Sequence, residues 1–195
     1  MSSLVRPIRP GESADPEVNK LLEQARDGWW NDAAMFGVIA RQPDLLKKIV
    51  PVFEAFFTAG RFPPYMFELM RLKTGEINRC AYCATVRVAG IRDEVAPKEG
   101  AVFGKPDQSA LSRREYLGVK LAEYMAGDPN YIPESFYKEL KAEFSEDEIV
   151  ELIFACSIFN FGNKFNISMR LDTSEESKYP KGMAYPLKAA QVAAA

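Results

Sequence analysis

The sequence predicts an all-α fold. Apolar residues recur at helical spacing from residue 17 to residue 170, strand-like alternation of useful length is absent, and capping residues mark several helix starts. A chain of 195 residues that is 47% hydrophobic can bury one core and is too short for two independent domains. We therefore expect a single domain, 1–195, containing six to seven helices, with its core at about 17–170 and a polar tail at 171–195.

Four helices are expected in the first half of the chain, at about residues 16–29, 43–58, 65–74 and 78–90. Asp15 suits the cap of the first helix and Pro16 its first turn. Gly75 is expected to end the third helix, and Asn78 is the candidate N-cap of the fourth. The residues expected to face the core are Leu21, Leu22, Ala25, Leu45, Leu46, Ile49, Val50, Phe53, Phe56, Met66, Leu69 and Met70.

The second half begins with a predicted loop. Residues 91–108 contain two prolines, two glycines and no periodicity, so we expect the longest internal loop there, and such a loop could cover a site. Two capping boxes follow, Ser112 with Glu115 and Ser145 with Glu148. They predict helices that end at Gly127 and at about residue 170, with a shorter helix at 133–144 between them.

Charge and composition restrict the partners. The chain has 25 basic and 27 acidic residues, a net charge of -2 and no basic run, so we expect no nucleic-acid or anionic-lipid partner. The N-terminal segment lacks the apolar core of a signal peptide, and no stretch approaches the roughly 18 apolar residues of a membrane span. We expect a soluble, cytoplasmic protein that binds a small molecule or another protein.

The chain has no histidine and three cysteines. The absence of imidazole excludes Ser-His and Cys-His nucleophilic pairs. Cys80 and Cys83 form one CxxC motif, for which redox chemistry, half a zinc site and plain packing are the alternatives. Zinc is disfavoured because only Cys156 is left to add, and no metal or cofactor is expected. Cys156 itself lies on an apolar helical stripe and is expected to be buried and unreactive.

The position of the CxxC motif favours the redox alternative. If Asn78 caps the helix, Cys80 falls at its second position and Cys83 lies three residues further on. Both sulfurs would then face the same side, near the positive end of the helix dipole. This environment lowers the pKa of a thiol and makes a thiolate available near neutral pH.

The segment FELMRLKTGEINRCAYCATVRVAG resembles the signature of the carboxymuconolactone decarboxylase and alkylhydroperoxidase D-like family. That signature is a glutamate, eleven residues, CxxC, and a histidine four residues after the second cysteine. Here Glu68 stands twelve residues before Cys80, and the flanking segments extend the resemblance over about residues 17–170. The resemblance implies a trimer or hexamer of helical protomers that reduces a small-molecule hydroperoxide or disulfide and is recycled by an external thiol reductant.

The resemblance also implies roles for individual residues. Cys83 would be the peroxidatic thiol, Cys80 the more exposed resolving thiol, Glu68 the carboxylate that begins proton removal, and Tyr82 a proton relay. The chain departs from the family at Arg87, which stands where the histidine belongs. Arginine does not deprotonate in proteins, so it cannot relay a proton, although on the same helix face it can stabilise a thiolate.

Structural alternatives stand beside these roles. Glu68 can form a salt bridge with an arginine, Tyr82 can be a core or interface aromatic, and Arg87 can be an ion pair or a solvated charge. The asparagines expected to bridge helices or subunits are Asn160, Asn163 and Asn166. The leading prediction is a thiol oxidoreductase. Its rivals are lactone-acid chemistry, as in carboxymuconolactone decarboxylase itself, and a noncatalytic oligomeric binding protein.

Overall fold

A computed structural model describes residues 3–58 and 60–173, and throughout this part of the chain the regular structure is helical, which confirms the all-α class. The α-helices are α1 (Pro16–Asp27), α2 (Ala34–Ile39), α3 (Pro43–Thr58), α4 (Pro64–Ile77), α5 (Ala81–Thr85), α6 (Arg92–Val102), α7 (Arg113–Ala126), α8 (Glu134–Glu143) and α9 (Glu146–Ser168), with a 3-10 helix, η1 (Pro129–Tyr131), before α8. None of these helices has both the length and the apolar character needed to cross a membrane. The predicted tail lies almost wholly outside the described residues.

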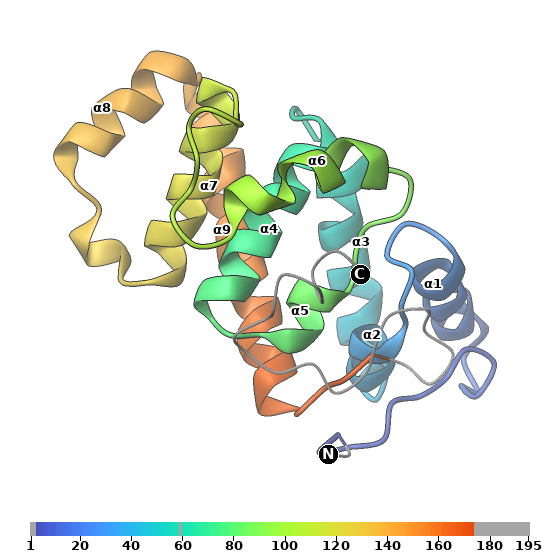
Figure 1. Ribbon diagram of the computed structural model, residues 1–195. Coiled ribbons are helices and arrows are strands. Elements are labelled where there is room, and N and C mark those ends of the chain that lie inside the picture. The colour runs from blue at the N-terminus through green and yellow to red at the C-terminus, as the bar shows by residue number, and fades with distance from the viewer. Residues whose placement is uncertain (1–2, 59, 174–195) are drawn as a thin grey trace.

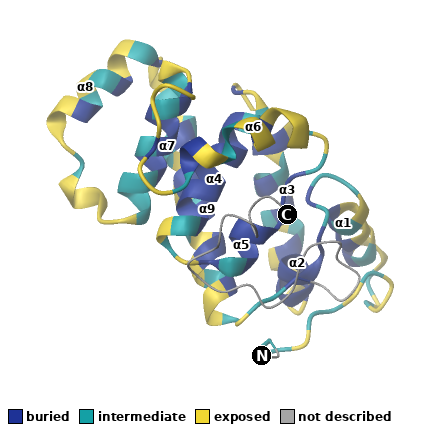
Figure 2. Ribbon diagram, in the orientation of Figure 1, coloured by how far each residue is buried: buried dark blue, intermediate teal, exposed yellow. Residues whose placement is uncertain are grey.

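Helix α4 lies at the centre of the molecule and contacts α3, α5, α6, α7 and α9 (Figure 1). Every residue from Met66 to Gly75 is buried, so the helix has no solvent face along most of its length (Figure 2). Three of these buried residues are Glu68, Arg71 and Lys73. Charges removed from water in this way must be paired and hydrogen-bonded.

A glycine allows α7 to pack closely on α4. A Cβ atom at Gly118 would lie 2.9 Å from Cε of Met66 and 3.2 Å from Sδ of Met70. On the other side of α4, the core continues through a cluster of aromatic rings from α2, α3, α9 and the segment before α2. These aromatic residues are Trp30, Phe36, Phe53, Phe56, Phe57 and Phe159.

Several predicted helix boundaries are confirmed. Helix α1 begins at Pro16, and the Asp15 side chain accepts the Glu17 N–H. Helix α3 covers the predicted range, and both predicted capping boxes form at the starts of α7 and α9. Among the predicted core positions, Leu45 is wrong because its side chain is 58% exposed, whereas Val18, which was not predicted, is fully buried.

The structure departs from the predicted helices at four points. Residues 92–102 form helix α6 instead of a loop, because Val95, Ala101 and Val102 bury against α4 despite the proline inside the helix. Helix α4 continues through Gly75 to Ile77, so Asn78 is its C-cap and not the N-cap of the next helix. Helix α5 has only five residues, and the short helix α2 was not predicted.

We predict that Gly118→Val lowers the free energy of unfolding by about 1–3 kcal/mol, because added methyl groups would overpack the α4–α7 contact. Urea denaturation measures this loss. The matched control is Gly100→Val in α6, where a Cβ atom meets no other atom within 4 Å. Equal effects of the two substitutions would contradict the close packing described above.

Candidate functional site

Cys80 and Cys83 form a disulfide at the start of α5, with their Cα atoms 5.3 Å apart. Cys80 is the N-cap residue, and its Sγ accepts the backbone N–H of Cys83 at 3.3 Å. The exposed fractions are 1% for Cys80 and 4% for Cys83. The expectation that Cys80 is the more exposed thiol is therefore wrong for this chain.

A tight reversal after α4 brings the CxxC motif back onto that helix. Arg79 adopts the left-handed conformation, with φ of 56°, and the Cys80 N–H donates to the Gly75 carbonyl at 2.9 Å. A Cβ atom at Gly75 would lie 3.4 Å from Cβ of Cys83, so a larger residue would press on the motif. Because α5 aligns only a few peptide dipoles, its dipole supports a thiolate less than the predicted longer helix would.

Arg71 and Glu68 form a fully buried ion pair beneath this turn. Two nitrogens of the Arg71 guanidinium donate to the two Glu68 carboxylate oxygens, each at 2.7 Å. The same guanidinium donates to the Cys83 carbonyl and to the Val86 carbonyl, and the Val88 N–H donates to Glu68. Glu68 thus has an arginine partner, which is the structural alternative foreseen for it.

Arg87 closes the other end of α5. Its guanidinium donates to the Ala84 and Thr85 carbonyls and forms an ion pair with Glu99 of α6, with an Nε to Oε1 distance of 2.7 Å. Helix α5 ends at Thr85, so the premise that Arg87 shares a helix face with Cys83 is wrong. Of its predicted alternatives, Arg87 adopts the ion pair, and it does so while 4% exposed rather than solvated.

Tyr82 belongs to a buried hydrogen-bond chain. Its hydroxyl donates to the Asp32 carboxylate at 2.9 Å and accepts the Trp30 indole N–H at 3.2 Å. Burial, followed by the nearby negative charge of Asp32, raises the pKa of Tyr82 well above its ordinary value. Asp32 and Trp30 were not predicted as site residues, because they lie about fifty positions from Tyr82 in a segment without periodicity.

The three asparagines of α9 divide into two groups. Asn78 donates to the side-chain oxygens of Asn160 and Asn163, so these two bridge α9 to the end of α4 as expected. Asn166 instead contacts two sulfur atoms, since its Nδ2 atom lies 3.3 Å from Sγ of Cys83 and 3.3 Å from Sδ of Met35. Their spacing identified all three asparagines, but not the contact of Asn166 with the sulfur.

A small cavity lies beside Cys83. Its volume of about 10 Å³ is close to that of a single water site. It is lined by Trp30, Met35, Phe53, Arg71, Cys83, Phe159, Gly162, Asn163 and Asn166.

Cys156 is fully buried, as expected, and burial raises the pKa of its thiol. Cys156 is not part of the disulfide, so Cys80 and Cys83 remain the candidate redox pair.

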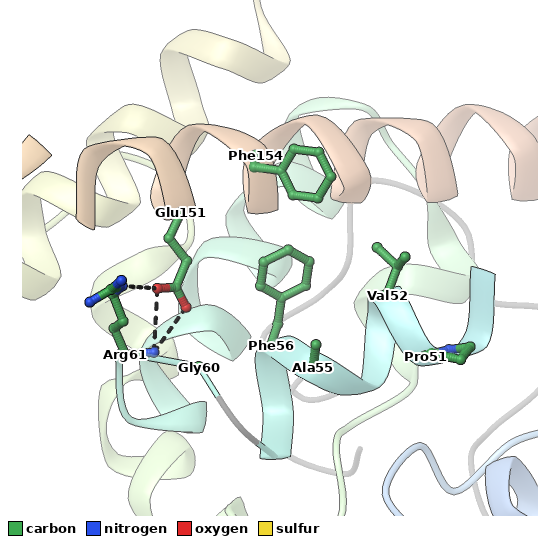
Figure 3. A pocket seen from close by; sticks show the side chains of 8 residues that line it. All are labelled: Pro51, Val52, Ala55, Phe56, Gly60, Arg61, Glu151 and Phe154. Carbon is green, nitrogen blue, oxygen red and sulfur yellow. Dashed lines mark hydrogen bonds and ion pairs between the residues drawn. The ribbon is translucent and has the colours of Figure 1, made fainter. Parts of the chain in front are cut away.

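A larger hollow of about 510 Å³ lies between α3 and α9 and does not include the disulfide. Figure 3 shows that Val52, Ala55, Phe56 and Phe154 form its apolar wall, while the Glu151 carboxylate accepts the Arg61 N–H at one end. Phe154 is 53% exposed here. This hollow carries no group suited to thiol chemistry, so the candidate site is the cavity beside Cys83.

Comparison with solved structures shows that the chain has an alkylhydroperoxidase D-like fold. The debrominase Bmp8, in a variant bound to 2,3,4-tribromopyrrole, has a TM-score of 0.71 and 16% identity, covering 90% of this chain and 94% of Bmp8. An uncharacterized peroxidase-related protein from Ralstonia eutropha JMP134, described as an alkylhydroperoxidase AhpD core, has a TM-score of 0.59 and 16% identity, covering 83% of this chain and 87% of that protein. The uncharacterized protein YdfG of Bacillus subtilis (strain 168) is 21% identical over 105 residues, 52% of this chain and 71% of YdfG. No family model matches the chain.

We predict that Glu68→Gln and Arg71→Met each lower the free energy of unfolding by about 3–5 kcal/mol, because each leaves a buried charge without its partner. The double variant is expected to lose less than the sum of the two single losses. Urea denaturation of all four proteins measures this coupling. Arg113→Met, which breaks the half-exposed pair with Glu139, is the control and should cost less than about 1 kcal/mol. Additive losses at Glu68 and Arg71 would contradict the pairing.

The raised pKa of Tyr82 predicts a pH dependence. In the unfolded chain a tyrosine loses its proton near pH 10, whereas in the folded chain Tyr82 keeps it, so stability falls as pH rises above about 10. Tyr82→Phe removes this contribution. The stability difference between wild type and variant should shrink by up to about 1.4 kcal/mol per pH unit above pH 10. Urea denaturation from about pH 8 to about pH 11 measures it, with Tyr131→Phe, at a 78% exposed position, as the control.

Proposed function

We propose that this protein is a thiol-dependent oxidoreductase that reduces hydroperoxides or disulfides through Cys80 and Cys83. The observation that carries the proposal is the disulfide between these two residues at the start of α5, with the Cys83 sulfur lining a small cavity. The Cα separation of 5.3 Å is normal for a disulfide, so the pair can close without displacement of the backbone. The alkylhydroperoxidase D-like fold agrees with this chemistry.

The proposed cycle with a hydroperoxide has three steps. The Cys83 thiolate attacks the terminal oxygen, an S–O bond forms, and the O–O bond breaks, with its electron pair leaving on the other oxygen, which takes up a proton. The Cys80 sulfur then attacks Cys83, the S–O bond breaks, and the departing oxygen leaves as water with the proton of the Cys80 thiol. An external thiol reductant finally reopens the disulfide and is itself oxidised.

The proposed roles of the neighbouring residues follow from their contacts. Cys83 is the attacking thiol because its sulfur accepts a hydrogen bond from Asn166 and lines the cavity. Glu68 acts as a positioning residue, since its carboxylate holds Arg71, which in turn holds the Cys83 carbonyl. Tyr82, paired with Asp32, is the candidate proton relay. Arg87 holds the end of α5 in shape.

The rival functions find less support. Lactone-acid chemistry calls for a cation that can bind the substrate carboxylate, but Arg71 and Arg87 already hold Glu68 and Glu99. The cavity is also too small for a ring such as the bromopyrrole bound by Bmp8.

The assembly of this protein as a homo-oligomer, a trimer or a hexamer, stays a prediction. We propose that its contact involves α9, because Val150, Phe154 and Phe161 of this helix are exposed.

The test is a thiol count on the reduced protein before and after a slight excess of hydrogen peroxide, tert-butyl hydroperoxide or a small disulfide. We expect two thiols to be lost, with recovery by a dithiol, while Cys156 reacts only after unfolding because burial raises its pKa. Cys83→Ser should abolish the loss. Cys80→Ser should allow oxidation of Cys83 without disulfide closure. An unchanged count with every oxidant, with Cys80 and Cys83 still open to alkylation, would rule out the proposed function.

A further inference from the structure

Asn166 presents two hydrogen-bonding groups at the cavity, and only one of them is used. The side chain is 2% exposed, and its Nδ2 atom lies within hydrogen-bond distance of the Cys83 and Met35 sulfurs. Its Oδ1 atom is buried and, among the described residues, receives no hydrogen bond. A buried carbonyl oxygen without a donor is costly, so a missing donor is expected at this point.

The cavity that Asn166 lines has the size and the polarity to supply that donor. About 10 Å³ holds one water-sized group, and Arg71, Asn163 and Asn166 make part of its wall polar. The Asn163 oxygen already accepts from Asn78, and Arg71 already donates to Glu68 and to the Cys83 carbonyl. The Asn166 oxygen is therefore the acceptor available to a new O–H group.

We propose that this cavity is an oxygen-binding site, in which Asn166 accepts the O–H of the peroxide oxygen that is transferred to Cys83. The same amide donates its N–H to the Cys83 sulfur, so one side chain aligns the two reacting atoms. This inference rests on the proposed thiol oxidoreductase function and extends it. It makes a hydroperoxide the oxidant that the site recognises, because a disulfide has no O–H group for the Asn166 oxygen to accept.

The cycle agrees with a site of this size. The thiolate sulfur is oxidised as it bonds to one peroxide oxygen, and the other oxygen leaves with the electron pair of the O–O bond and takes up a proton. When Cys80 attacks, the S–O bond breaks and that single oxygen departs as water, carrying the Cys80 proton. The structure has the disulfide already closed, and the space beside Cys83, about 10 Å³, is close to the minimum needed for one water.

Gly162→Ala tests the site by filling it. A Cβ atom there would lie 3.4 Å from Cζ of Phe53 and 4.0 Å from Sδ of Met35, which are ordinary contacts, so the variant should fold. We expect its rate of thiol loss with hydrogen peroxide to fall by about tenfold to a hundredfold, because the oxygen can no longer lie against the sulfur. Reduction of its disulfide by dithiothreitol should stay within about twofold of wild type.

The outcomes separate this inference from the proposed function. A wild type that reacts with neither peroxide nor a small disulfide overturns both. If wild type reacts with hydrogen peroxide and Gly162→Ala reacts equally fast, the oxygen site is wrong and the thiol function stands. If Gly162→Ala loses both peroxide and dithiothreitol reactivity, the alanine has disturbed the disulfide and the oxygen site is again not supported.

Asn166→Ala provides a readout other than turnover. In a Cys80→Ser background, the pH dependence of thiolate absorbance gives the pKa of Cys83. Loss of the N–H donor should raise that pKa by about one, so that the thiolate fraction near neutral pH falls about tenfold. Asn160→Ala, on the same helix but bonded to Asn78 and the Met125 carbonyl, is the matched control and should leave the pKa unchanged. Equal pKa values in the two variants would overturn the role of Asn166.

Discussion

The buried ion pair between Glu68 and Arg71 is the constraint on which the geometry of the site depends. Removing two charges from water is costly, and the pair is tolerated because the remaining N–H and oxygen positions are also bonded. Those further bonds reach the Cys83 and Val86 carbonyls and the Val88 N–H. A helix as short as α5 has little stability of its own, so the core of α4 holds it in place through these contacts.

The groups that can stabilise a Cys83 thiolate in this structure differ from the helix dipole that the sequence predicts. A long helix beginning at Asn78 would have stabilised a thiolate through its dipole, but Asn78 ends α4 and α5 has five residues. The groups beside the motif are instead the Arg71 guanidinium, behind the Cys83 carbonyl, and the Asn166 amide at the sulfur. Both come from neighbouring helices, so the reactivity of the motif depends on the packing of α4, α5 and α9.

Local signals in the sequence predicted much of the fold, and long-range contacts account for most of what it missed. Capping boxes and proline positions gave the starts of α1, α7 and α9 because a cap is formed by residues close in sequence. Helix α6 was missed because burial of Val95 against α4 outweighs the effect of its proline and its glycine. At the site, Cys80 and Cys83 were recognisable from their spacing. Asp32 and Asn166, in contrast, lie 50 and 83 positions in the sequence from the motif residues that they contact.

Arg87, which stands where the signature has a histidine, makes several contacts that an imidazole could not make. Its guanidinium caps carbonyls at the end of α5 and pairs with Glu99, a carboxylate on the helix that the sequence did not predict. An imidazole at this position has too few N–H groups for these partners, so it would leave Glu99 and at least one carbonyl without a donor. Arg87→His alone would therefore not reproduce the proton relay that the resemblance to the signature implies. In the proposed cycle, Tyr82, which donates to Asp32, is the candidate proton relay, and Asn166 of α9 holds the reacting oxygen beside the Cys83 sulfur.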